Sequence, residues 1–530
     1  MLLWGSNARE THPIFFHHVL KGVRHGAQLF VVDPRRTSTA QWAETSGGRW
    51  LGLDVGSDIS LANAIGREIV TAGLHNEKFI RNATTGFEAW RECVEKYTLD
   101  RAAAETGLDP ELIRELAHTY ARAPMAMICW TLGITEHHNA VDNVFALINL
   151  SLLTGHVGRW GSGLNPLRGQ NNVQGGGDMG ALPGRLPGFQ DLENPAIRAR
   201  FDSTWNTTLP PKQGWHLTEM FHAMERGEMR ALYVIGENPC QSEADAHRAR
   251  KILSGLDHLV VQDILMTATA EMADVVLPAA AAWCESEGTV TSSERRVQRV
   301  RKALEPPGEA HDDIVILCDL ARALGHDWGH PTSEQVWDEL RSLSPNHTGM
   351  SYRHLEELGG IQWPCHDEQH PGEPFLHGRL WEEPVQGRKA PFHAVENDPP
   401  ADKITADFPI RLTTGRRLES FNTGVQTGQY RSPLRFGETL DLHPDDGRRY
   451  DVSAGERVRV VSRRGAVEAP VRFDLSLRPG LAFMTLHFPD EVDTNVLTID
   501  ATDPKSGTAE FKASAIRIEK LASPVPSGTR

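Results

Sequence analysis

The sequence predicts an α/β fold with two doubly wound α/β domains and a C-terminal six-stranded β-barrel. Two stretches, one starting at residue 1 and one near residue 231, repeat the order of apolar strand, polar carboxyl end and helix. After about residue 405 the pattern changes to short strands separated by Gly, Pro and Asp turns, which is typical of a barrel. A chain of 530 residues also exceeds the length that one hydrophobic core supports. We expect α/β domains at 1–170 and 171–330, a connecting segment at 331–400, and the barrel domain at 401–530.

The first domain opens with a buried parallel strand. The apolar run from Met1 to Trp4 leads directly into the turn Gly5-Ser6-Asn7, and a helix is predicted from about Pro13 to His25. A second strand, from Ala27 to Val32, ends in Asp33-Pro34-Arg35-Arg36. Doubly wound sheets bind ligands at the carboxyl ends of their strands, so both turns are candidate ligand contacts.

Two polar positions in this domain have a simpler explanation as helix caps. Gly56-Ser57-Asp58 opens another helix, where backbone N–H groups face an anion, and Asp33 lies where such folds meet a ribose or a purine edge. On spacing alone the cap is the better explanation of each, because Ser and Asp are preferred there.

A third core strand is predicted from Met125 to Leu132, ending at Gly133-Ile134-Thr135-Glu136 and followed by a helix from about Asn139 to Thr154. His137 and His138 are adjacent and point to opposite sides of most backbones, which argues against a metal site. No metal-ligating residue is predicted anywhere in the chain.

The segment from Asn165 to Gly180 has no apolar period and predicts a loop. It carries side-chain amides at five positions, glycine at five, and a single cation, Arg168. A guanidinium is planar and permanently charged, and it holds a small carboxylate through two parallel hydrogen bonds. On composition alone such a segment is more often an ordinary surface connection.

The second domain repeats the order of the first. Strands are predicted at Ala231–Ile235, His258–Val261 and Ala273–Leu277, with a helix at about 243–254. The first strand ends at Gly236-Glu237-Asn238-Pro239 and the second at Gln262-Asp263. Strands of the barrel are predicted at Ile410–Thr413, Arg457–Val461, Ala466–Val471, Leu481–Leu486 and Ala515–Ile518.

Composition excludes several classes of protein. The formal charge of 55 − 70 = −15 argues against a general nucleic-acid binder, and no apolar run approaches the roughly 20 residues of a membrane span. The six cysteines are scattered without a C-x-x-C pair, so the chain signals neither zinc nor an iron–sulfur cluster. Unpaired cysteines and the lack of a signal peptide suit the cytoplasm. We reject the adjacent Cys365 and His366 as a catalytic pair.

The run NPLRGQNNVQG, continued by DMGALPG, resembles the active-site loop of molybdenum or tungsten formate dehydrogenases, which bind two molybdopterin guanine dinucleotides. The resemblance covers essentially the whole chain. For the first dinucleotide it implies contacts from Gly5, Ser6, Asn7, Glu10, Thr11, Asp33, Pro34, Arg35, Gly56 and Ser57, with Gly133 near the metal. For the second it implies Gly236, Glu237, Asn238, Gln262, Asp263 and Thr267. For the barrel that closes over both it implies Thr414, Gly415, Arg416, Asn495 and Lys512.

The resemblance also implies a reaction. Arg168 is expected to bind the carboxylate of formate and to orient its C–H bond, Gln170 to support Arg168, and Gly169 and Asn171 to shape the pocket. Formate is oxidised to carbon dioxide at molybdenum or tungsten, and the electrons pass through a 4Fe–4S cluster to iron–sulfur or flavin subunits.

One part of the family pattern is missing. The family begins with a cysteine-rich segment for the 4Fe–4S cluster, followed by a Cys or selenocysteine metal ligand beside a His, and no residue here matches those positions. We therefore expect a truncated reading frame, or a subunit completed by another chain, with little formate oxidation by this chain alone.

Two alternatives remain open. One is another molybdopterin oxidoreductase such as a nitrate reductase, whose loop typically reads T-G-Q-P and lacks the arginine. The other is a non-catalytic pterin-binding partner.

Overall fold

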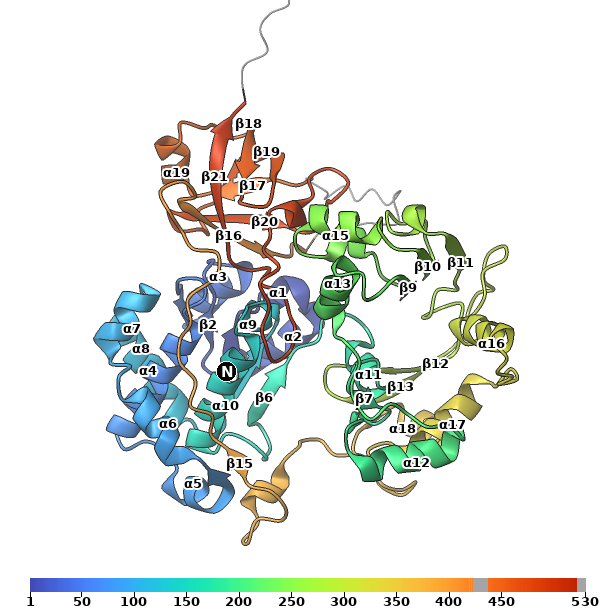
Figure 1. The fold of residues 1–530 in the computed structure, drawn as a ribbon. Coiled ribbons are helices and arrows are strands. Elements are labelled where there is room, and N and C mark those ends of the chain that lie inside the picture. The colour runs from blue at the N-terminus through green and yellow to red at the C-terminus, as the bar shows by residue number, and fades with distance from the viewer. Residues whose placement is uncertain (419, 421, 423–436, 522–530) are drawn as a thin grey trace, which may run out of the picture. The chain divides into compact units, whose positions relative to one another are not determined.

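The computed structural model describes residues 1–418, 420, 422 and 437–521. These residues fall into two compact units (Figure 1). The first unit is built from Met1–Pro166, Gln241–Arg250 and His377–Arg530, and the second from Leu167–Cys240 and Lys251–Leu376.

A parallel five-stranded sheet forms the centre of the first unit, in the order β3-β2-β1-β5-β6. The strands are β1 (Leu2–Trp4), β2 (Phe30–Val32), β3 (Arg49–Leu51), β5 (Met127–Trp130) and β6 (Gly163–Pro166). The order reverses between β1 and β5, so the sheet is doubly wound and its switch point lies at the carboxyl ends of these two strands. The predicted α/β class is confirmed.

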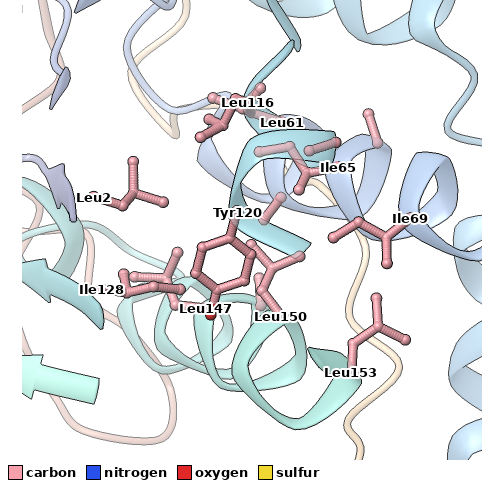
Figure 2. Packing of buried hydrophobic residues seen from close by; sticks show 14 of the residues in the cluster. Leu2, Leu61, Ile65, Ile69, Leu116, Tyr120, Ile128, Leu147, Leu150 and Leu153 are labelled. Carbon is pink, nitrogen blue, oxygen red and sulfur yellow. The ribbon is translucent and has the colours of Figure 1, made fainter. Parts of the chain in front are cut away.

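Three helices contribute to the core beside this sheet: α4 (Asp58–Thr71), α8 (Pro110–Arg122) and α10 (Ala140–Thr154). Figure 2 shows the apolar side chains that α4 and α10 turn toward each other, which are Leu61, Ile65, Ile69, Leu147, Leu150 and Leu153. Burying each such side chain contributes roughly 1.5–3 kcal/mol.

The prediction of the third strand is wrong at the carboxyl end of that strand. β5 ends at Trp130, and Leu132–Thr135 forms a helical turn, α9. The hydroxyl of Thr131 and the N–H of Gly133 both donate to the carbonyl of Gly5, at 2.6 and 3.3 Å. These bonds fold the chain over the end of β1 instead of letting it extend.

The prediction of an unbroken loop at Asn165–Gly180 is also wrong. β6 takes the first residues, because they pair with β5, and α11 (Val173–Asp178) takes later ones. Asn172 precedes α11 with a φ of +69°, and its side-chain oxygen accepts the N–H of Thr291 at 3.0 Å. A tertiary contact therefore starts a helix that three glycines would disfavour.

The remaining elements of the first unit before the barrel are short. They are α1 (Ala8–Thr11), α2 (Pro13–Arg24), α3 (Ser38–Thr45), α5 (Glu77–Ala83), β4 (Thr84–Thr85), α6 (Phe87–Val94), α7 (Leu99–Thr106), η2 (Gly378–Trp381) and β15 (Ala390–Pro391). The short helices α14 (Pro239–Ser242) and α15 (Ala246–Leu253) follow the first strand of the second unit.

The C-terminal strands of the first unit form a closed barrel in the order β16-β20-β17-β19-β18-β21. They are β16 (Ile410–Gly415), β17 (Leu440–Leu442), β18 (Arg457–Val461), β19 (Ala466–Phe473), β20 (Leu481–Thr485) and β21 (Ser514–Lys520), with α19 (Pro444–Arg449) and η3 (Thr494–Val496) beside them. The predicted six-stranded barrel is confirmed. Five strands match predicted segments; β17 has three residues and gave no period to detect.

The second unit contains a parallel three-stranded sheet in the order β11-β10-β9, made of β9 (Ala231–Ile235), β10 (His258–Asp263) and β11 (Val275–Pro278). An antiparallel sheet is made of β12 (Gly288–Thr291), β13 (Arg296–Val300) and β14 (Ile361–Gln362). The other elements are β7 (Arg185–Leu186), β8 (Gln190–Asp191), α12 (Pro195–Trp205), α13 (Leu217–Glu225), η1 (Ala270–Met272), α16 (Asp313–Ala323), α17 (Ser333–Leu343) and α18 (Tyr352–Leu358).

A separate small core lies between α17, α18 and the antiparallel sheet. It is formed by Val297, Trp337, Met350, Tyr352, Leu355, Ile361 and Cys365. The segment after residue 330 therefore contributes packed helices to the second unit. Among the described residues, no helix combines the length and the apolar character needed to cross a membrane.

Candidate functional site

The turns after β1 and β5 touch at the switch point of the first sheet. Gly5 has a φ of +56°, and a Cβ added to Gly133 would lie 2.6 Å from both the Cα and the carbonyl oxygen of Gly5. Glycine at both positions lets the two backbones cross at this distance. The predicted cofactor residues Gly5 and Gly133 are thus brought together.

Ser6 follows Gly5 and carries a buried hydroxyl. The residue is 1% exposed, and its Oγ has no hydrogen-bond partner within the described part of the chain. A buried hydroxyl without a partner costs about 1–3 kcal/mol, so its retention at a switch point points to a ligand.

The next predicted residues are held by the start of α3. The side-chain oxygen of Asn7 accepts from Thr39 Oγ1 at 2.8 Å, and Glu10 accepts from the hydroxyl of Ser38 at 2.6 Å. Thr11 donates to the carbonyl of Asn7 at 3.1 Å. These contacts fix the shape of the first turn.

The turn after β2 meets the barrel. The guanidinium of Arg35 stacks over the ring of Phe483 with 3.7 Å between its central carbon and the ring centroid. A Cβ added to Gly415 would lie 2.8 Å from that ring and 3.4 Å from an Arg35 nitrogen. The predicted residues Arg35 and Gly415 therefore share one contact.

Lys512 adds a second cation to this edge. Its Nζ lies 2.8 Å from a carboxylate oxygen of Glu136 and donates to the carbonyl of Thr414 at 3.1 Å. Arg416 lies close enough to His487 to help lower the pKa of that histidine, after burial, to about 4. Basic side chains from the barrel thus gather beside the carboxyl ends of the sheet.

The first unit also contains two buried carboxylates, Asp33 and Asp58. Burial raises the pKa of Asp33, opposed by the charges of Arg35 and Lys512 and by the Arg35 N–H, which donates to it at 2.9 Å. Burial likewise raises the pKa of Asp58, whose oxygen accepts from the indole of Trp4 at 2.7 Å. Asp33 does not cap a helix, so the cap explanation fails for it.

The cap explanation also fails for Ser57. Its hydroxyl donates to the carbonyl of Asp54 at 2.6 Å and makes no bond to the start of α4. Gly56 has a φ of +83°, and a Cβ there would lie 2.5 Å from Pro400. Pro34 is half-buried in the neighbouring turn.

Asn495 ties the barrel to the segment after β9. Its amide nitrogen donates to the carbonyls of Gln241 and Ser242 at 2.8 and 3.2 Å, and its oxygen lies 3.2 Å from the Thr498 hydroxyl. This buried side chain is fully used by the protein, so a direct cofactor contact is not needed to explain it.

In the second unit the predicted residues gather at the carboxyl ends of β9 and β10. Gly236 has a φ of +64° with open space where a Cβ would be, and Glu237 beside it is exposed. Asn238 accepts from Thr269 Oγ1 at 2.7 Å.

The partners of the β10 residues are within the unit. Gln262 binds the hydroxyl of Tyr233 and the carboxylate of Asp313. Asp263 accepts from the N–H of Ile264 at 2.7 Å, and Thr267 Oγ1 accepts the Ala270 N–H at 3.2 Å. Burial raises the pKa of Asp263.

Arg168 lies in the second unit with its side chain exposed, directly before Gly169 and Gln170. Its backbone N–H and carbonyl both bond the hydroxyl of Ser293, each at 2.9 Å, and its Nε donates to Gln174 Oε1 at 3.2 Å. These bonds fix the backbone of Arg168, and burial lowers the pKa of its guanidinium, opposed by the charge of Asp178.

Sequence reasoning missed the residues behind Arg168. Gln174 and Asp178 are four residues apart on α11, and Trp363 reaches Asp178 from the segment after β14. The spacing of four between Gln174 and Asp178 could have indicated that they share one face of a helix, but this segment was predicted to be a loop. The contact between Asp178 and Trp363 joins residues 185 positions apart, so no local sequence pattern indicates it.

The rejected pair Cys365–His366 has no catalytic geometry. Cys365 is buried in the small core, its Sγ lies 3.2 Å from the carbonyl of His370, and burial raises its pKa to about 11. His366 Nδ1 lies 3.3 Å from the carbonyl of Pro345. A thiol with this pKa stays protonated at neutral pH.

Comparison with known proteins places this geometry in a family. Residues 1–323 match the sequence model described as molybdopterin oxidoreductase, and residues 410–515 match the molydopterin dinucleotide binding domain. The F420-dependent formate dehydrogenase subunit alpha of Methanocaldococcus jannaschii is 39% identical, over 98% of this chain and 76% of its own length.

Two further relatives cover nearly the same span. Formate dehydrogenase H of Escherichia coli is 35% identical over 98% of this chain and 73% of its own length. The assimilatory nitrate reductase catalytic subunit of Bacillus subtilis is 32% identical over 98% of this chain and 74% of its own length.

A solved structure shares the fold. Acetylene hydratase from Pelobacter acetylenicus superposes with a TM-score of 0.74 at 20% identity, over 98% of this chain and 77% of its own. The architecture, the two family matches and the relatives agree. The chain is an oxidoreductase of the molybdopterin oxidoreductase family, and its barrel is a molybdopterin dinucleotide-binding domain.

Proposed function

We propose that this protein is the catalytic subunit of a formate dehydrogenase, which oxidises formate to carbon dioxide at a bis-molybdopterin guanine dinucleotide centre. The observation that carries the proposal is Arg168, an exposed guanidinium on a fixed backbone within the run RGQNN. Three relatives are named as formate dehydrogenases, and their similarity to this chain covers 98% of this chain and at least 73% of each relative.

Arg168 supplies the recognition of substrate. Formate is a small carboxylate, and the planar guanidinium holds both of its oxygens through parallel hydrogen bonds. Gln170 supports that arrangement, and Gly169 keeps the neighbouring backbone free of a side chain. The reaction breaks the C–H bond of formate and yields carbon dioxide, a proton and two electrons. A fixed carboxylate directs that bond to one side, which is an orientation effect.

The residues at the carboxyl edges fit the phosphates and the polar rings of the cofactor. In the first unit the unsatisfied hydroxyl of Ser6 and the cations Arg35, Arg416 and Lys512 are suited to one dinucleotide. In the second unit the open turn at Gly236 is suited to the other. When bound, the molybdenum or tungsten of the cofactor accepts the electron pair.

The same proposal covers the path of the electrons. A 4Fe–4S cluster and partner subunits that carry iron–sulfur or flavin groups would take up the electrons released by formate. The six cysteines, which form no disulfide among the described residues, suit a cytoplasmic enzyme. The alternative of nitrate reduction is favoured by one relative, at 32% identity, and is tested together with formate.

Replacing Arg168 by lysine tests the proposal. Lysine keeps the charge but loses the two-pronged geometry, so we expect kcat/KM for formate to fall about 100-fold, which corresponds to roughly 3 kcal/mol. Formate-dependent dye reduction by the cofactor-loaded enzyme, with its associated subunits, measures this, and molybdenum, tungsten and pterin contents check loading.

Arg301→Lys is the matched control, because Arg301 is an exposed arginine of the same unit, paired with Glu356. It should retain the wild-type kcat/KM. A change of less than twofold in Arg168→Lys, or a wild-type enzyme that reduces nitrate and leaves formate untouched, contradicts the proposal.

A further inference from the structure

A buried carboxylate lies two hydrogen bonds behind Arg168. Arg168 Nε donates to Gln174 Oε1 at 3.2 Å, and Gln174 Nε2 donates to Asp178 Oδ1 at 2.8 Å. The other oxygen of Asp178 accepts from the indole Nε1 of Trp363 at 2.8 Å. Asp178 is 3% exposed, and all four side chains belong to the second unit.

The chemistry of Asp178 decides which way the Gln174 amide points. An ionised carboxylate only accepts hydrogen bonds, so Gln174 must turn its NH2 group toward Asp178. Its carbonyl oxygen is then left facing the Arg168 Nε–H, which only donates. The orientation seen in the amide is the one that satisfies both neighbours.

Asp178 is itself fixed from two sides. Trp363 has a single polar donor, and that donor is bound to Asp178. Arg295 stacks on the Trp363 ring with 5.1 Å to the centroid and donates to the carbonyl of Glu373 at 3.0 Å. Burial raises the pKa of Asp178, opposed first by the hydrogen bonds from Gln174 and Trp363 and then by the charges of Arg168 and Arg295.

We propose that Asp178 is a positioning residue, which orients the substrate-binding guanidinium of Arg168 through the Gln174 amide. The inference rests on the proposed role of Arg168 as the carboxylate ligand. Asp178 touches neither substrate nor cofactor in this account; it sets the direction in which Arg168 presents its nitrogens.

In Asp178→Asn the hydrogen bonds that link Trp363, residue 178, Gln174 and Arg168 can no longer all form. Asparagine has one oxygen and one NH2 group, and its oxygen must face the Trp363 donor. Its NH2 group then faces Gln174. Whichever way the Gln174 amide turns, two donors meet, either at residue 178 or at Arg168. We expect kcat/KM for formate to fall about 10- to 30-fold.

Removing the Trp363 donor should repair that defect. In Asp178→Asn with Trp363→Phe, asparagine is released from the indole and turns its oxygen to Gln174, so the bond to Arg168 forms again. We expect kcat/KM of the double variant within threefold of Trp363→Phe alone. Its thermal midpoint should nevertheless be the lowest of the set, because the asparagine NH2 is then buried without an acceptor. A purely structural role for Asp178 predicts a double variant worse than either single variant in both measurements.

A second readout does not depend on formate. Phenylglyoxal modifies arginine side chains, and peptide mass spectrometry gives the rate at Arg168 in the cofactor-loaded enzyme. We expect Arg168 to react at least threefold faster in Asp178→Asn and at the rate of Trp363→Phe in the double variant, with Arg301 unchanged throughout.

The outcomes separate the two proposals. A wild-type enzyme without formate turnover contradicts the proposed function. In that case the rates of arginine modification still decide whether Asp178 positions Arg168. Equal Arg168 reactivity in wild type and Asp178→Asn, or a double variant that fails to recover both the rate constant and the reactivity, overturns the positioning role.

Discussion

Removing the hydroxyl of Ser6 should affect protein stability and cofactor binding in opposite directions. This hydroxyl is buried without a partner in the described part of the chain, at the turn where the first sheet reverses its strand order. We expect Ser6→Ala to leave the cofactor-free protein as stable as wild type or about 1 kcal/mol more stable, because an unsatisfied group is removed. Retention of pterin during purification should fall several-fold, as measured by pterin fluorescence after release.

Tyr450→Phe is the control for this effect, because Tyr450 also has a buried hydroxyl without a partner but packs against the barrel core. It should change stability in the same direction and leave the pterin content at the wild-type level. Equal pterin content in both variants would contradict a ligand role for Ser6.

Residue chemistry also shows where the sequence was sufficient for the site. Arg168 could be proposed from the sequence because the run NPLRGQNNVQG resembles an active-site loop, whereas its composition alone favoured an ordinary surface connection. Asp178 was not, because its partners are Trp363 and a helix that exists only after the chain has folded. A role could be predicted for a side chain only where the residues that suggest that role are neighbours in sequence.

At the scale of elements, the crossing of the turns after β1 and β5 leaves no room for a side chain. A Cβ at Gly133 would overlap backbone atoms of Gly5, which cannot move without shifting the strand. We expect Gly133→Ala to lower stability by about 1–3 kcal/mol and to reduce the bound pterin. Chemical denaturation of the cofactor-free protein measures the first effect.

Gly288→Ala is its control, because nothing lies within 4 Å of a Cβ added there. That variant should keep both stability and pterin. If Gly133→Ala behaves like the control, the two turns do not cross as closely as described.

Elements with a strong apolar pattern were predictable from sequence, and short paired ones were not. β9 and β18 begin and end at the predicted residues, because β9 is an apolar run and β18 alternates arginine with buried valine. β3 and β17 have three residues each and are strands only because a neighbour offers a backbone to pair with. α11 likewise depends on a contact with a distant strand.

At the scale of the whole molecule, Glu510 connects the C-terminal segment to the region behind the Gly133 turn. Its Oε1 lies 3.4 Å from His137 Nδ1 and 3.1 Å from His138 Nδ1, and its Oε2 accepts the N–H of Ala401 at 3.1 Å. Burial acts to raise the pKa of Glu510, but both histidines outweigh it and lower the pKa to about 2.

A carboxyl whose pKa is lower in the folded state stabilises the fold above its unfolded value of 4.5 and loses that stabilisation as pH falls toward 2. We expect the wild type to lose on the order of 3 kcal/mol over this range through Glu510, and Glu510→Gln to lose correspondingly less. Thermal unfolding midpoints between pH 3 and 6 measure the difference.

Near pH 6 the same variant should be less stable than wild type by roughly 2–3 kcal/mol, because the histidines lose a buried anion. Glu77→Gln, at a side chain that is 80% exposed, should follow the wild-type curve. If the thermal midpoints of wild type and Glu510→Gln fall in parallel between pH 6 and pH 3, the contacts with His137 and His138 do not lower the pKa of Glu510.

The closure of the C-terminal barrel restricts how other proteins attach to it. Each of its strands has two hydrogen-bonded neighbours, so in the described part of the barrel the strands leave only short stretches paired on one side, such as Ala466–Pro470 of β19. The open sheets are different, since β3 and β6 each end a sheet. A subunit that joined by strand addition would therefore find a longer free edge on such an outer strand, whereas one that docks on the barrel would recognise mainly side chains.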